Sequence, residues 1–178
     1  MLMTMMSRIP VATCIALGLA VPAFGQGAER VASHTDWSVF VASNPKECYI
    51  VAPPKSSKAT RDGKAVEVDR GDIRLFVSFR PGSGVSKEVS FTGGYPLQPG
   101  RAVTLKVGTA SFSMSPGTGD SGEWAWTDPS EDASAVAAMR RGSEAVLSGV
   151  SSRGTSTVDT FSLAGFTAAV TDAEARCK

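Results

Sequence analysis

The chain ends on the segment DTFSLAGFTAAVTDAEARCK (159–178), in which the end of a strand leads through a turn into an amphipathic helix. Phe166, Val170 and Cys177 recur at helical spacing, so one stripe of the predicted helix faces the core. Gly165 weakens the start of this helix, because glycine has a low helix propensity. A thiol one residue from the carboxyl terminus would be exposed and easily oxidised at a frayed chain end. The segment therefore predicts a C-terminal helix that is tied back to the rest of the protein through Cys177.

The amino terminus has the pattern of a secretory signal. Arg8 is the single positive charge before the apolar stretch 11–24, which ends among small residues suited to cleavage. This stretch is too short for a transmembrane span. Cys14 suggests a lipoprotein signal as an alternative, but the residue before it is a poor match and the apolar run continues past it. We expect residues 1–25 to be removed, with Gln26 as the first residue of the mature chain.

The remaining residues, 26–178, have the size of one ordinary domain and can bury a core of their own. The formal charge of +1 falls to about zero once Arg8 is removed. A neutral chain without a polybasic run argues against nucleic acid or anionic lipid as a partner. We expect a single exported domain, periplasmic or secreted, with no nucleic-acid partner and no integral membrane span after cleavage.

Two cysteines remain in the predicted mature chain, Cys48 and Cys177. An even number of cysteines in an exported protein is typical of a disulfide. A redox-active pair is the alternative, but the C-x-x-C spacing that lowers a thiol pKa is absent from the sequence. We therefore predict a structural disulfide that joins the C-terminal helix to an early strand.

Most of the chain alternates short apolar-patterned runs with turn residues, which predicts strands. The run 73–79 places alternate apolar side chains on one face, and the turn PGSG (81–84) predicts a hairpin with 88–92. A second hairpin is predicted around Gly108. The predicted strands are 37–42, 48–52, 64–69, 73–79, 88–92, 102–107, 110–114, 123–126, 144–150 and 155–162.

One helix besides the C-terminal one is predicted, over 128–139. Asp128 supplies an N-cap, a proline follows at the first helical position, and Glu131 completes the capping pattern. Gly142 ends this helix after two arginines that complement its dipole. Many short strands with two brief helices predict a mainly β fold, a β-sandwich of one domain.

The sequence offers no catalytic constellation. His34 is the one histidine, and it stands alone upstream of the first predicted strand, where neither metal ligands nor a nucleophile elbow accompany it. The carboxylates fall in turns or, as Glu131 and Asp132 do, in the first turn of a helix. We predict no catalytic residue, no metal site and no cofactor. A small hydrolase that uses carboxylates or a serine remains a rival hypothesis.

Trp124 and Trp126 are candidate partner-binding residues. In a strand over 123–126 the period of two sends both indoles to the same face. We favour core packing, because aromatic side chains dominate sandwich interiors. The alternative is an aromatic platform for a sugar, a peptide or a protein, since tryptophan is common in binding hot spots.

The sequence resembles the invasion-associated locus B (IalB) family of small exported bacterial proteins. The resemblance rests on Trp37 followed by Cys48, on the central strands and turns, and above all on FSLAGFTAA (161–169). It implies an immunoglobulin-like β-sandwich, a periplasmic or secreted location and a family-level link to host-cell entry. It supplies no known reaction, cofactor or catalytic residue. Unlike many members, this chain has no further cysteine pair in its middle, where 122–136 reads GEWAWTDPSEDASAV.

Together these observations favour an exported, non-enzymatic binding protein of the bacterial cell envelope. The expected partner is an envelope or host-surface protein or glycan. A structural envelope protein without a specific ligand is the second rival to this hypothesis.

Overall fold

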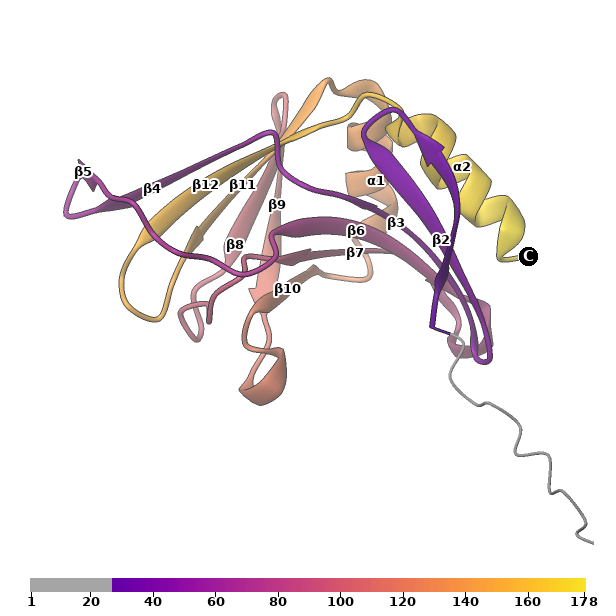
Figure 1. The fold of residues 1–178 in the computed structure, drawn as a ribbon, viewed down its shortest axis with the longest axis horizontal. Helices are drawn as coiled ribbons and strands as arrows, with labels where there is room; N and C mark the ends of the chain where they lie inside the picture. Colours follow the sequence, from indigo (N-terminus) through magenta and orange to yellow (C-terminus); the bar gives the residue numbers. More distant parts are fainter. Residues whose placement is uncertain (1–26) are drawn as a thin grey trace, which may run out of the picture.

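The computed structural model describes residues 27–178 (Figure 1), so the predicted signal segment 1–25 lies outside the described residues. In this part of the chain the protein is mainly β, with two α-helices of which one is C-terminal, as predicted. Twelve strands form a single sheet there, and all paired neighbours are antiparallel. The elements are β1 (Glu29–His34), β2 (Trp37–Ser43), β3 (Lys46–Ala52), β4 (Ser56–Arg61), β5 (Lys64–Ala65), β6 (Arg74–Arg80), β7 (Val85–Thr92), β8 (Val103–Val107), β9 (Ala110–Pro116), β10 (Trp124–Thr127), α1 (Asp132–Arg141), β11 (Glu144–Val150), β12 (Ser156–Ser162) and α2 (Phe166–Arg176).

The sheet folds over its own core. Its strand order is β1-β2-β3-β6-β7-β10-β9-β8-β11-β12-β4-β5. After β3 the chain crosses to the far edge, where β4 pairs with β12, and then returns to place β6 beside β3. Phe91 on β7 and Phe161 on β12 lie far apart in this order, yet their ring centroids are 6.2 Å apart across the interior. The curvature is compatible with the expected sandwich, and its immunoglobulin-like arrangement stays a prediction.

The two predicted hairpins are confirmed. β6 pairs with β7 across the turn at 81–84, and β8 pairs with β9 across Gly108. Leu75, Val77 and Phe79 are buried on one face of β6, as their alternation predicts. Leu75 lies opposite Phe91 in the register, so that the hairpin buries apolar side chains from both strands together.

The prediction of a strand over 64–69 is wrong beyond its first two residues. Only Lys64–Ala65 form a strand, β5, which pairs with Thr60 and Arg61 of β4. The backbone N–H of Val66 still donates to the carbonyl of Ala59 at 3.0 Å, and the pairing ends there. The following residues form a mostly exposed loop that leads to β6. The strands β1 and β4 were not predicted, because their sequences, ERVASH and SSKATR, show little alternation of apolar and polar residues.

The helix predicted over 128–139 begins later than expected. α1 starts at Asp132, and Asp128 instead caps a turn, in which the backbone N–H of Ser130 donates to its carboxylate at 2.9 Å. The predicted end is confirmed, since α1 stops at Arg141 and Gly142 follows it.

Asp132, in the first turn of α1, also makes hydrogen bonds to the sheet. Its carboxylate is buried and accepts hydrogen bonds from the backbone N–H of Val89 at 3.0 Å and from the hydroxyl of Thr127. Burial raises the pKa of the Asp132 carboxyl, and the hydrogen bonds from Thr127 and Val89 oppose that shift. These contacts attach the start of α1 to the neighbouring strands β7 and β10.

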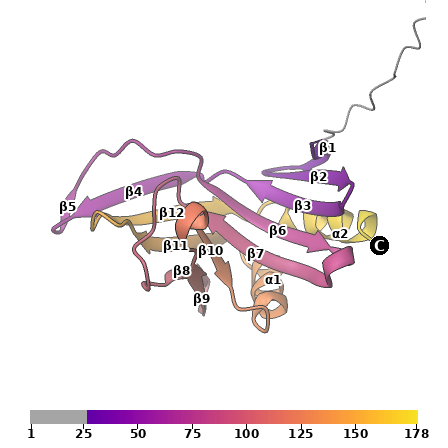
Figure 2. The ribbon, with the colours of Figure 1, turned by 90° about the horizontal axis from the view of Figure 1, so that it is seen from below.

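α2 packs against β1, β2 and β3 at one end of the molecule, whereas the β4–β5 hairpin lies at the other (Figure 2). The predicted helical stripe is confirmed, because Phe166 and Val170 are fully buried and Cys177 is 7% exposed. The Phe166 ring meets Trp37 of β2 edge-to-face, with centroids 5.0 Å apart. The Trp37 indole N–H donates to the carbonyl of Ser162 at 3.0 Å, which joins β2 to the end of β12.

Replacing Gly165 with alanine is expected to lower the free energy of unfolding by about 3 kcal/mol or more. Gly165 has a φ of +85°, and an added Cβ would collide with the carbonyl oxygen of His34. Gly108→Ala is the matched control, since Gly108 has a φ of +57° but nothing within 4 Å of such a Cβ. That variant should lose only about 1–2 kcal/mol, the cost of the left-handed backbone. Urea unfolding followed by tryptophan fluorescence measures both losses, and equal losses would contradict the role of the His34 contact.

Candidate functional site

Trp124 and Trp126 lie on the outer face of the sheet, so the favoured interpretation of core packing is wrong. On β10 the small residues Ala125 and Thr127 are buried, while both indoles are half-buried. β10 pairs with β7 along one edge and with β9 along the other. Because alternate residues of a strand point to the same face, Trp124 and Trp126 lie on the same side of the sheet. Partner binding by these residues stays a prediction.

The two tryptophans belong to a continuous row of aromatic side chains across the outer face. Phe40 and Tyr49 are neighbours in the β2–β3 register, and their ring centroids are 5.1 Å apart. The row continues through Tyr49–Phe76 at 5.9 Å, Phe76–Trp124 at 5.3 Å and Trp124–Trp126 at 6.2 Å. We call these five side chains, contributed by β2, β3, β6 and β10, the aromatic row.

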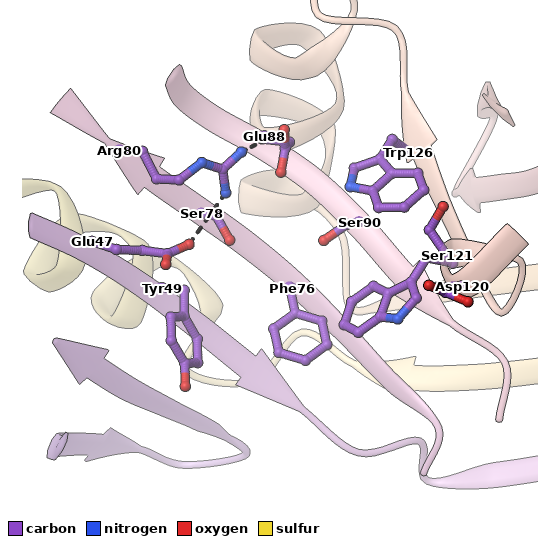
Figure 3. Close-up of a pocket in the computed structure, with 11 residues that line it drawn as sticks. Glu47, Tyr49, Phe76, Ser78, Arg80, Glu88, Ser90, Asp120, Ser121 and Trp126 are labelled. Atoms are coloured by element: carbon purple, nitrogen blue, oxygen red, sulfur yellow. Dashed lines mark hydrogen bonds and ion pairs between the residues drawn. The ribbon is translucent and has the colours of Figure 1, made fainter. Parts of the chain in front are cut away.

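A shallow groove of about 460 Å³ runs beside the aromatic row, and we call it the aromatic groove. Figure 3 shows the rings of Phe76 and Trp126 nearly face-on, with the small side chains of Ser78 and Ser90 between the aromatic side and Arg80. Because serine leaves space that a larger side chain would fill, these two positions keep the groove open. Its lining residues are Glu47, Tyr49, Phe76, Ser78, Arg80, Glu88, Ser90, Asp120, Ser121, Trp124 and Trp126.

One end of the groove is charged. The Arg80 guanidinium donates to the carboxylate of Glu88 at 2.7 Å and to that of Glu47 at 3.2 Å (Figure 3). The hydrogen bond to Glu88 is the main reason that the pKa of Arg80 is raised above its ordinary value. Two carboxylates thus share one guanidinium at this end, and Asp120 adds a further carboxylate at the opposite end of the groove, beside Ser121 (Figure 3).

The Tyr49 phenol remains protonated at neutral pH. Burial raises its pKa, and the negative charge of Glu47 raises it further. A neutral phenol can donate a hydrogen bond as well as present its ring. Tyr49 presents its ring to the groove, and its hydroxyl points away from Arg80 and the two serines (Figure 3).

Sequence reasoning missed Phe40, Tyr49, Phe76 and Arg80 as site residues. A usable signal was present in the run 73–79, whose core face is already filled by alternate apolar residues. Phe76 then falls on the opposite face, where a strand with one solvated side ordinarily carries a polar residue. An aromatic side chain on the solvated face of a strand therefore marks a candidate site residue. The sequence of that one strand does not show which residues of other strands will lie beside it.

The predicted cysteine pair lies directly behind the groove. The structure places Cys48 of β3 and Cys177, after α2, at disulfide distance, with their Cα atoms 5.8 Å apart. Cys48 points to the interior, whereas its sequence neighbours Glu47 and Tyr49 line the groove on the outer face. The pair thus connects α2 to the strand that carries one side of the groove.

His34 has a structural contact. Its Nε2 lies 3.0 Å from the carboxylate of Asp172, which links β1 to α2. This contact, followed by the hydrogen bond from Arg176, lowers the pKa of Asp172. Within residues 27–178 no group of three or more His, Cys, Asp or Glu side chains could hold a metal ion.

A second, more polar cavity lies between the 66–73 loop and the segment 151–157. Arg70, which lines this cavity, makes two hydrogen bonds to Asp159, at 2.8 and 2.7 Å, and a third to the carbonyl of Gly93 at 2.9 Å. The guanidinium also lies 4.8 Å from the ring centroid of Tyr95. All of these contacts tie the loop to the body of the sheet, so we assign them a structural role.

The fold and the groove define a mainly β protein whose curved antiparallel sheet carries an aromatic outer face and is backed by a C-terminal helix. The chain belongs to the invasion associated locus B (IalB) family, because the family model "Invasion associated locus B (IalB) protein" matches residues 37–174. That match runs from the start of β2 into α2 and includes every residue of the aromatic groove. The suspected resemblance is thereby confirmed.

The family is associated with an invasion locus and is not a known enzyme family. No curated protein and no solved structure matches the chain. Among the described residues, no helix has the length and apolar character needed to cross a membrane.

Proposed function

We propose that this protein is an exported, non-enzymatic binding protein of the bacterial cell envelope, which holds a partner in the aromatic groove. The aromatic row is the observation that carries the proposal. An antiparallel sheet with one face toward solvent ordinarily places polar residues there. Aromatic side chains gathered on such a face typically mark a contact surface.

Two further observations support the proposal. A disulfide persists in oxidising compartments, so the Cys48–Cys177 pair supports a location outside the cytoplasm. Glu47 and Glu88 are both engaged by Arg80, an arrangement that suits a binding surface better than a pair of carboxylates poised for acid–base work. The proposed partner is an envelope or host-surface component.

Site-directed crosslinking in living cells tests this function. A photoreactive phenylalanine analogue at Phe76 keeps an aromatic ring in the groove, and the same analogue at the exposed Thr109, in the β8–β9 turn, is the matched control. We expect one abundant, reproducible crosslinked partner from position 76 and none from position 109. A scatter of neighbours from both positions would instead indicate a structural envelope protein without a specific ligand.

Replacing Trp124 and Trp126 together with alanine is expected to reduce the yield of that crosslinked partner by about thirtyfold. The estimate corresponds to the loss of about 2 kcal/mol that is typical of a binding hot spot. Val146→Ala is the control, because Val146 is a half-buried apolar residue on β11, away from the groove. Circular dichroism should show that both variants remain folded, and an unchanged yield in the tryptophan variant would contradict the proposal.

A further inference from the structure

We infer that the aromatic groove takes a cationic side chain, a lysine or arginine presented by an extended segment of a partner protein. This inference rests on the proposed function, because it names the chemistry of the partner for that same groove. It is carried by the juxtaposition of open aromatic faces and excess carboxylates on the outer face of β3, β6, β7 and β10.

The charge balance of the groove is negative. Its lining contains the carboxylates of Glu47, Glu88 and Asp120 but only one cationic group, Arg80, which leaves a formal charge of −2. Arg80 bonds Glu47 and Glu88 through one N–H each, so carboxylate acceptor capacity remains on both.

The nearest further cation along β6 does not change this balance. Arg74 projects from the same face of the strand as Phe76, and its guanidinium donates to Asp72 at 3.1 Å. Its charge is therefore compensated locally. The carboxylates at the groove remain in excess, and they favour a partner of positive charge.

The aromatic side of the groove favours the same charge. A cation is attracted to the face of an aromatic ring, most strongly to that of tryptophan. Trp124 and Trp126 are half-buried, so they retain exposed ring surface, and Figure 3 shows the Trp126 ring nearly face-on. An aliphatic lysine or arginine stem can cover the ring while its charged group reaches a rim carboxylate.

The shape of the groove favours an extended peptide segment as the carrier of this side chain. Nine of the eleven lining residues come from β3, β6, β7 and β10, which are consecutive in the sheet, and the other two, Asp120 and Ser121, come from the turn before β10. Three strand spacings correspond to about 14 Å, the length of about four residues of extended chain. A neutral glycan could stack on the rings but would leave the excess carboxylates uncompensated, and an anionic headgroup would be repelled.

A peptide selection tests this inference on protein produced from the full chain. A random dodecapeptide phage library is selected on the wild-type protein and depleted on the Trp124→Ala/Trp126→Ala variant. We expect the enriched sequences to be rich in lysine and arginine. The affinity of an enriched peptide, measured by fluorescence polarisation, should fall as the salt concentration rises, because exposed charges are screened.

A charge reversal then locates the interaction. Asp120→Lys is expected to weaken binding of the enriched peptide by about tenfold at low ionic strength, since a rim charge acts mainly through electrostatic attraction. Asp120 lies on an exposed loop, so the fold should not change. Glu67→Lys is the matched control, because it makes the same charge change on an exposed residue just after β5, at the other edge of the sheet. That variant should bind within about twofold of the wild type.

The outcomes separate this inference from the proposed function. Enrichment of acidic or neutral peptides that still require the tryptophans would overturn the cationic partner and leave a binding groove in place. If no peptide is enriched and the protein binds a glycan array through the tryptophans, the cationic partner is likewise overturned and the binding groove remains. Equal binding by Asp120→Lys and wild type would also overturn the inference. If no probe binds through the tryptophans and crosslinking from position 76 finds no partner, both proposals fail.

Discussion

Replacing Cys48 and Cys177 together with alanine is expected to lower the free energy of unfolding by about 5 kcal/mol. The two residues are 129 positions apart in the sequence, so the bond closes a loop that contains almost the whole domain. In the chain-entropy model, a loop of this length gives about 5 kcal/mol because the cross-link restricts the unfolded chain. Urea unfolding of both proteins under oxidising conditions measures the difference.

Reduction of the wild-type protein provides the control for this prediction. With a reductant present, its unfolding midpoint should approach that of the double alanine variant, which should itself be insensitive to reductant. Intact mass after alkylation, with and without reduction, reports the bond directly. Free thiols in the native protein, or a loss below about 1 kcal/mol, would contradict the prediction.

Arg70→Ala is expected to destabilise the protein by about 3–5 kcal/mol, because it leaves the carboxylate of Asp159 buried without its partner. The side chains of Arg70 and Asp159 are only 7% and 0% exposed. The variant also loses the hydrogen bond to the Gly93 carbonyl and the contact with the Tyr95 ring. The loss is measured as the change in free energy of unfolding in urea at neutral pH.

An exposed arginine and a double variant sharpen this test. Arg74→Ala removes a pair with Asp72, whose side chain is 84% exposed, and should cost less than about 1 kcal/mol. Arg70→Met/Asp159→Leu replaces the buried pair with apolar side chains and should be more stable than Arg70→Ala alone. If Arg70→Ala were no more destabilising than Arg74→Ala, the buried pair would not anchor the loop.

Both interactions support the strands that form the aromatic groove. Cys48 fixes β3 from its inner face, opposite Tyr49. Arg70 holds the carbonyl of Gly93, and the N–H of Gly93 donates to the carbonyl of Glu123, immediately before Trp124. The groove therefore rests on elements whose positions are fixed by contacts from the interior, which favours a preformed binding surface.

Local patterns in the sequence were sufficient for most of the secondary structure. The alternation in 73–79 has a period of two, which each strand displays by itself, and turn residues mark the hairpins. Gly142 marks the end of α1 in the same local way. These predictions succeed because strand pleat, turn conformation and helix ends depend mainly on residues close in sequence.

The candidate site was predicted only in part. Trp124 and Trp126 were recognised as a pair on one face, but which face is buried depends on the volume that the other strands leave. The interior has room for Ala125 and Thr127 there, and the indoles take the outer side. Phe40, Tyr49 and Phe76 become their neighbours only through the register of separate strands.

By itself the sequence determined the mainly β class, the two hairpins and the C-terminal helix, because these depend on local periodicity. It also determined the family of the protein, because the segment 161–169 is recognisable. The tertiary structure alone decided the pairing of β4 with β12, the burial of Arg70 against Asp159 and the assembly of the aromatic row. Each of these joins residues that are distant in sequence. Their contacts arise from competition among all strands for partners and for burial, which no local pattern records.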